Sequence, residues 1–159
     1  GSYYWNPNST YQSAFVDNAP ATADILQMSA AGTRTLSFSQ PIDNLFIAIV
    51  SLNRNSYLFD TDFEIVSSGP GQFGSGTLTR TETSGLFKLA GSIASEEPHG
   101  VIRFKEAVTS ISWEAQYFEH WHGITIGTYG VATPDAGSTL AMFGMAIAAG
   151  AGLRLRRAR

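Results

Sequence analysis

Apolar and polar residues alternate in short runs along most of the chain, and turn-forming residues interrupt these runs about every eight to twelve positions. Alternate side chains of a strand point to opposite faces of its sheet, so this pattern is typical of an all-β protein. No helical period persists before Thr139. We therefore expect about nine to ten strands, within 24–29, 35–39, 45–52, 57–59, 63–67, 77–83, 86–90, 100–105, 109–115 and 123–128.

These strands predict a single antiparallel, jelly-roll-like β-sandwich over residues 1–130, followed by a C-terminal transmembrane-type α-helix. Residues 45–50 are apolar throughout, which indicates a central strand covered on both faces. From 57 to 65 the odd positions are expected in the core, and the even positions form a stripe that includes Asp60, Asp62 and Glu64. The same alternation predicts that Trp113 is a core residue.

The end of the chain is organised differently. A polar linker at 131–138 leads into an apolar run at 139–153, and residues 154–159 contain Arg154, Arg156, Arg157 and Arg159. The apolar run as a helix would span about 22 Å, less than the roughly 30 Å hydrocarbon core of a bilayer, so it would be a marginal membrane anchor. Clustered arginines favour the cytoplasmic side of a membrane, which would leave the preceding residues outside.

This order of a short polar motif, an apolar helix and a basic end resembles the PEP-CTERM family of bacterial sorting signals, in its Pro-Asp-x-Gly-Ser-Thr variant. The matching residues are Pro134, Asp135, Gly137, Ser138 and Thr139, although Thr133 stands where that family usually has valine. The resemblance implies recognition by an exosortase, a membrane protease that cuts near the motif and delivers the protein to the cell surface or the medium.

The body of the chain is also similar to short exported PEP-CTERM proteins, a group that implies no assigned catalysis. The similar segments are Gly69-Pro70-Gly71, Gly100-Val101-Ile102-Arg103-Phe104, Ile111-Ser112-Trp113 and Trp121-His122-Gly123. Export also implies a signal peptide upstream of Gly1.

The charge disfavours one class of partner, and the cysteine content excludes several kinds of chemistry. Four of the ten Lys and Arg residues lie in the last six positions, so the rest of the chain has six basic against twelve acidic residues before Pro134. An acidic body disfavours nucleic acid as a partner. The absence of cysteine excludes disulfides, thiol catalysis and thiolate metal sites.

Two sets of residues could hold a metal ion. His120 and His122 would share one face of a strand, with His99 as a third ligand for Zn²⁺; the alternative is a loop whose imidazoles bond backbone groups around a packed Trp121. The carboxylates of Asp60, Asp62 and Glu64 could hold Ca²⁺, or they could be a solvated stripe that protects an edge strand. We expect no cofactor, with Zn²⁺ or Ca²⁺ as the alternative.

Aromatic residues provide the other candidate site. Tyr3, Tyr4 and Trp5 are interspersed with Asn and Ser, and together with Trp121 they could stack on sugar rings; the alternative is an arm that tucks its rings into the sandwich. Glu96, Glu97, Glu114 and Glu119 have the residue type needed for glycoside hydrolysis, but no motif supports that role. We assign no catalytic residue.

The sequence thus predicts a non-enzymatic protein with four regions: an ectodomain at 1–130, a linker with the sorting motif at 131–138, the apolar helix at 139–153 and the cytoplasmic tail at 154–159. It would be tethered to the inner membrane as a precursor and then released to the cell surface, where extracellular polysaccharide is the expected partner. The alternatives are a small Zn²⁺- or Ca²⁺-dependent glycan-binding or hydrolytic module, and an envelope protein whose tail anchor is never cut.

Overall fold

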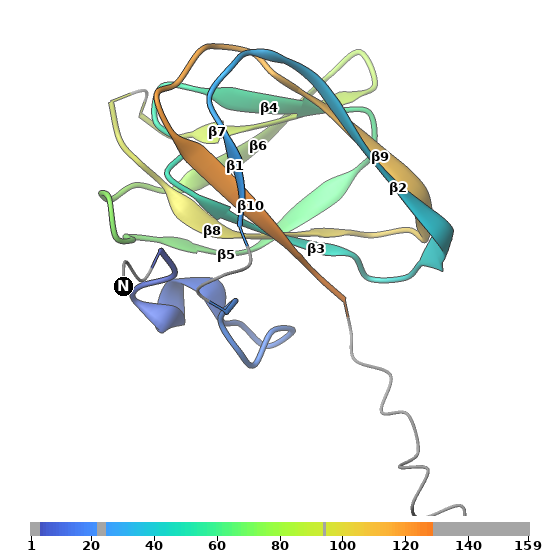
Figure 1. The fold of residues 1–159 in the computed structure, drawn as a ribbon, viewed down its shortest axis with the longest axis horizontal. Helices are drawn as coiled ribbons and strands as arrows, with labels where there is room; N and C mark the ends of the chain where they lie inside the picture. Colours follow the sequence, from blue (N-terminus) through green and yellow to red (C-terminus); the bar gives the residue numbers. More distant parts are fainter. Residues whose placement is uncertain (1–3, 22–24, 94, 129–159) are drawn as a thin grey trace, which may run out of the picture. The chain divides into compact units, whose positions relative to one another are not determined.

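The computed structural model describes residues 4–21, 25–93 and 95–128, and within them the chain forms two antiparallel five-stranded β-sheets packed face to face (Figure 1). The elements, in chain order, are the 3₁₀ helix η1 (Asn8–Tyr11) and the strands β1 (Leu26–Met28), β2 (Gly32–Ile42), β3 (Phe46–Val50), β4 (Ser56–Phe59), β5 (Phe63–Gly69), β6 (Leu78–Thr83), β7 (Leu86–Gly91), β8 (His99–Phe104), β9 (Val108–Ala115) and β10 (His122–Gly127). The linker, the apolar run and the arginine-rich end lie outside the described residues. Among the residues that are described, no helix is long and apolar enough to cross a membrane.

The first sheet has the strand order β1-β10-β3-β8-β5, and the second has the order β2-β9-β4-β7-β6. Every pairing is antiparallel, so the prediction of an all-β antiparallel sandwich is confirmed. Each of the ten predicted strands corresponds to one observed strand. The largest difference is β2, which runs from Gly32 to Ile42 and includes Pro41, because a proline is tolerated on an edge strand at a shift in register.

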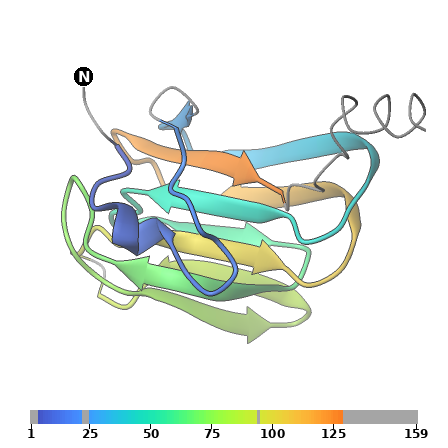
Figure 2. The same ribbon diagram turned by 90° about the horizontal axis from the view of Figure 1, so that it is seen from below.

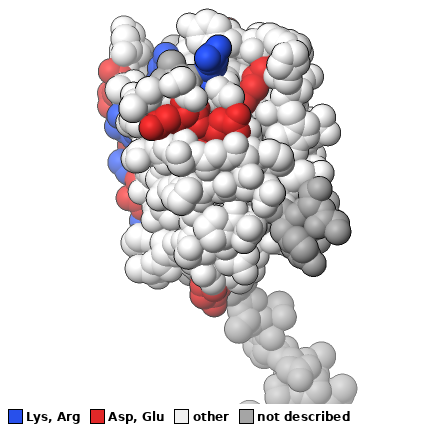
Figure 3. Space-filling model, turned by 90° about the vertical axis from the view of Figure 1, so that its left-hand side faces the viewer, with Lys and Arg blue, Asp and Glu red and all other residues white. Residues whose placement is uncertain are grey.

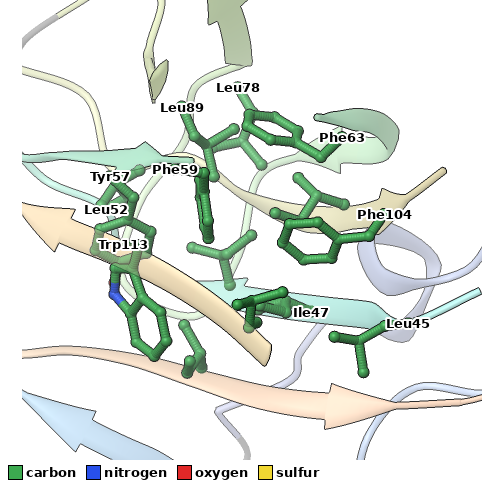
Figure 4. Packing of buried hydrophobic residues seen from close by; sticks show 14 of the residues in the cluster. Leu45, Ile47, Leu52, Tyr57, Phe59, Phe63, Leu78, Leu89, Phe104 and Trp113 are labelled. Carbon is green, nitrogen blue, oxygen red and sulfur yellow. The ribbon is translucent and has the colours of Figure 1, made fainter. Parts of the chain in front are cut away.

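The space between the sheets is filled by aromatic and aliphatic side chains from both (Figure 4). Phe59 lies at its centre, with its ring 5.2 Å from that of Phe63 and 5.5 Å from that of Phe104. Trp113 is buried beside it, as predicted from the alternation along β9. The apolar positions of each strand therefore face a common core, as the period of two requires.

The outer face of the first sheet is also covered. Along β3, Ile47 and Ile49 face the sheet-to-sheet core, whereas Ala48 and Val50 pack in a second cluster with Trp5 and other residues of the N-terminal segment. Figure 2 shows this segment, with η1, lying across the strands. The prediction that 45–50 is a central strand covered on both faces is therefore confirmed for β3.

The acidic stripe expected between 57 and 65 is not the face of one strand. β4 belongs to the second sheet and β5 to the first, so the chain turns from one sheet to the other between Phe59 and Phe63. Asp62 contacts Arg80 and Lys105, and Glu64 contacts Arg103. Burial alone would raise the pKa of Asp62, but hydrogen bonds from Lys105 and Arg80 hold that pKa below its usual value. These carboxylates are thus engaged by cationic side chains.

Candidate functional site

Five loops meet at one end of the sandwich, which we call the loop end. They are 29–31, 51–55, 70–77, 92–98 and 116–121, and all but Ala94 in them is described. The pairings Gly123 with Val50 and Gly69 with His99 place the strand termini that carry these loops side by side. The loop end lies on the left in Figure 1. Binding sites in sandwiches are commonly built from such loops on a rigid scaffold.

Three aromatic rings from distant parts of the chain form a cluster at the loop end, which we call the aromatic cluster. The ring centroid of Trp121 lies 5.2 Å from that of Tyr4 and 5.0 Å from that of Phe73, and Tyr4 and Phe73 are stacked at 6.2 Å. Tyr4 and Trp121 are half-buried, and Phe73 is 44% exposed. The cluster therefore presents apolar ring surface to solvent at a fixed place.

The aromatic cluster contacts a buried histidine, His99, through the ring of Phe73. The His99 ring is stacked on Phe73, and its Nδ1 lies 2.9 Å from the hydroxyl of Tyr11 and accepts a hydrogen bond from the backbone N–H of Ser51 at 3.3 Å. Because Nδ1 accepts, the proton of the neutral ring lies on Nε2. Burial lowers the pKa of His99 from 6.5 to about 4, so the imidazole is neutral at pH 7.

Gly71 allows the chain to pass over this histidine. A Cβ at position 71 would lie 2.2–2.4 Å from atoms of the His99 ring, which is well inside contact distance. The backbone of Gly71 also donates to the carbonyl of Gly74 at 2.8 Å and closes the turn that carries Phe73. The short glycine-rich loop is therefore held against the imidazole, and the position of Phe73 depends on it.

Polar groups lie beside the rings. Glu97 accepts a hydrogen bond from Asn53 Nδ2 at 2.6 Å and lies 3.4 Å from the hydroxyl of Ser51. A Cβ on Gly74, the residue after Phe73, would lie 2.8 Å from the Cβ of Glu97, so this glutamate is adjacent to the aromatic cluster. The backbone N–H of Asn53 donates to Glu119 at 2.8 Å. Asn53 thus joins two carboxylates from different loops.

The three histidines do not come together. His99 lies on the outer face of the first sheet, the same face as Val101, whereas His122 lies on the core face with Ile124. The Nδ1 of His122 lies 3.0 Å from the hydroxyl of Tyr57 and 3.3 Å from Glu119.

His120 is exposed, and its ring lies 5.3 Å from that of Phe118. Within the described residues no group of three His, Asp or Glu side chains is arranged to hold a metal ion, and this applies equally to Asp60, Asp62 and Glu64.

The predicted ligand-contacting residues are distributed differently from the expectation. Tyr4 and Trp121 do meet. Trp5 is 2% exposed and donates from Nε1 to the carbonyl of Ala21, so its ring is part of the packing between the N-terminal segment and the first sheet. Tyr3 lies outside the described residues. Phe73 is an addition that sequence reasoning missed, because only folding brings its loop beside Trp121.

The combination of rings and hydrogen-bonding groups defines what the loop end can bind. Its loops contain one Lys or Arg residue, Arg54, whereas Glu96, Glu97 and Glu119 are acidic. The guanidinium of Arg34 in β2 also lies at this end, where it donates to the carbonyl of Ala30. Figure 3 looks onto this end and shows a largely uncharged surface, with acidic side chains gathered in one part of it and basic side chains close to them. Exposed rings beside carboxylate and amide groups can pack on the apolar face of a polyhydroxylated ligand while bonding its hydroxyls.

Comparisons of the chain with protein-family models, with curated proteins and with solved structures gave no match.

Proposed function

We propose that this is an exported, non-catalytic bacterial surface protein whose loop end contacts carbohydrate. The observation that carries the carbohydrate assignment is the aromatic cluster of Tyr4, Phe73 and Trp121 beside Glu97 and Asn53. Flat ring faces cover the C–H faces of sugars, and the neighbouring carboxylate and amide can bond hydroxyl groups. The loops of this end carry three acidic residues, and its described residues include no cluster of cations, which favours an uncharged glycan over an acidic one.

The export part of the proposal is based on the end of the chain. The motif at Pro134–Thr139, the apolar run at 139–153 and the arginines at 154–159 have the order of an exosortase sorting signal. A helix too short to be a stable anchor suits a tether that is later removed. In this proposal a membrane-tethered precursor is cut, and the sandwich then acts at the cell surface or in the extracellular polysaccharide.

The strand order supports a jelly-roll type of sandwich. β1 neighbours β10, β2 neighbours β9, β3 neighbours β8 and β4 neighbours β7, so the first half of the strands pairs with the second half in reverse order. A long two-stranded ribbon folded over itself produces this order. Such a fold places the turns between successive strands at two ends and thereby gathers the loops of the site at one of them.

The carbohydrate assignment is tested with a glycan array probed with the full chain. A detergent with a polyoxyethylene head group is needed, because a sugar-headed one would compete. We expect binding to uncharged glycans that is reduced at least about tenfold by Trp121→Ala or Phe73→Ala. The matched control is Leu86→Ala, which removes another exposed apolar side chain at the opposite end of the sandwich. Binding to no glycan, or equal loss in the control, would refute the assignment.

The sorting part is tested separately by the intact mass of the protein recovered from the native cell surface or medium. A product that ends within 134–138 is expected. A full-length mass confined to the membrane fraction would instead support the permanently anchored alternative and would contradict processing.

A further inference from the structure

The loop that carries Trp121 exposes two more aromatic side chains. In loop 116–121, Tyr117 is 56% exposed and Phe118 is 65% exposed, and the latter is the most exposed large apolar side chain among the described residues. We call these two residues the outer pair. Both are close in sequence to Trp121, so the outer pair and the aromatic cluster lie at one end of the molecule. At 3.3–3.6 Å per residue, the backbone positions of Phe118 and Trp121 are at most about 11 Å apart.

The exposure of the outer pair is imposed by the fold, because the backbone of this loop is held at several points. The buried side chain of Asn55 accepts from the N–H of Tyr117 at 3.0 Å and donates to its carbonyl at 2.9 Å. Gln116 donates from its backbone to Ser56 at 3.0 Å, and Glu119 does so to Ser29 at 3.0 Å. Rearranging this loop to bury the two rings would break these hydrogen bonds and leave buried polar groups unpaired, which is unfavourable.

Holding large apolar side chains in water is unfavourable, and a rigid exposed patch next to another aromatic surface is typical of a recognition site. Residues 116–121 contain Glu119 and no Lys or Arg. The loops of this end carry Arg54 against three acidic residues, and the guanidinium of Arg34 is bonded to the carbonyls of Ala30 and Gly32. Among the described residues of this end there is thus no cluster of cations to attract an anionic partner. The surface is therefore suited to an uncharged ligand that extends from the cluster along the same loop.

We infer that the loop end binds an internal stretch of an uncharged polysaccharide chain, with one part of the chain on the aromatic cluster and a second part on Tyr117 and Phe118. This inference depends on the proposed carbohydrate function and specifies its ligand. Two contacts on one chain bind more tightly than either alone, because after the first contact the second is intramolecular. Affinity should therefore rise with the number of sugar units until both surfaces are covered, and then level off.

The test uses the full chain and a series of neutral and uronic-acid oligosaccharides of increasing length on one array, followed by titration calorimetry with the neutral series that binds. The expected result is an affinity that increases about tenfold or more from the shortest to the longest neutral oligosaccharide. Phe118→Ala should abolish this increase and leave the affinity for the shortest ligand unchanged. Trp121→Ala should weaken both, and Leu86→Ala neither.

The remaining outcomes separate the two proposals. Equal affinity for short and long chains, an unchanged length dependence in Phe118→Ala, or a preference for uronic acids would overturn this inference and leave the carbohydrate function standing. Absence of any glycan binding would remove both. If light scattering shows that the protein is a dimer and Phe118→Ala is a monomer, the outer pair is a contact between copies of the chain, and the inference is overturned. The circular dichroism melting curve of each variant checks that it is folded.

Discussion

Protonation of His99 is expected to destabilise the protein as the pH falls from 7 to 4. The imidazole is fully buried between Tyr11, Gly71 and Phe73, and its Nδ1 accepts the N–H of Ser51. Its pKa is about 4 in the folded protein against 6.5 for an ordinary histidine. Because the folded state binds the proton less readily than the unfolded state, this contribution to stability is fully present above pH 6.5 and is lost as the pH falls towards 4.

The magnitude follows from these two values. They differ by about 2.5, and each pKa unit corresponds to about 1.4 kcal/mol, so about 3 kcal/mol of unfolding free energy is lost from this residue between pH 7 and pH 4. Other groups also titrate in this range, so the measurement must be a difference. His99→Gln retains an acceptor for the N–H of Ser51 but cannot be protonated.

Urea denaturation of the wild type and of His99→Gln at several pH values gives the required comparison. We expect the wild type to be the more stable protein at pH 7 and the difference between the two to shrink, or to change sign, by about 3 kcal/mol at pH 4. A difference that stays constant from pH 7 to pH 4 would show that His99 does not titrate in the folded protein as its burial requires, and the reasoning would be refuted.

Three further substitutions test other parts of the structure. Gly71→Ala should cost about 2 kcal/mol or more, because its Cβ would overlap the imidazole beneath it, whereas Gly127→Ala meets only an ordinary contact at 3.8 Å and should be nearly neutral; thermal melting distinguishes the two. Phe59→Ala should cost about 3–5 kcal/mol in urea denaturation because it empties the centre of the core, and an effect no larger than that of Leu86→Ala would contradict the packing. Asp62→Asn should cost less than about 1 kcal/mol, and the cost should shrink in 1 M salt, because the two cationic partners of Asp62 lie at a partly exposed site.

The strands could be predicted from the sequence because every second side chain of a strand faces the core and is therefore apolar. Along β9, the residues Ile111, Trp113 and Ala115 alternate with polar ones, and the structure buries all three. In β3 the alternation is missing, and the inference of cover on both faces was correct because a continuous apolar run is stable only when water is excluded from both sides. What the pattern does not contain is which sheet each strand joins. The predicted acidic stripe therefore combined residues next to two different sheets, because alternation alone does not show where the chain passes from one sheet to the other.

The candidate site was only partly predictable for a related reason. Tyr4 and Trp121 could be proposed from residue type, but their meeting with Phe73 depends on strand pairings between distant segments. Asn53 carries no signal of a role in the sequence pattern, whereas in the structure it bonds both Glu97 and Glu119. Contacts between loops follow from the strand order, and strand order is a long-range property that local pattern does not specify.

The N-terminal arm, residues 4–21, connects the stability of the sandwich with its proposed function. Its residues Trp5 and Tyr11 cover Val50 and Val101 on the outer face of the first sheet, which would otherwise be an exposed apolar surface. Tyr11 also contacts His99, which supports Phe73, and Tyr4 contributes a ring to the cluster itself. The sequence left open whether the arm packs or binds; in the structure it packs through Trp5 and Tyr11 and presents Tyr4. Since the same segment covers the sheet and completes the aromatic surface, any change that undocks the arm should weaken folding and ligand binding together.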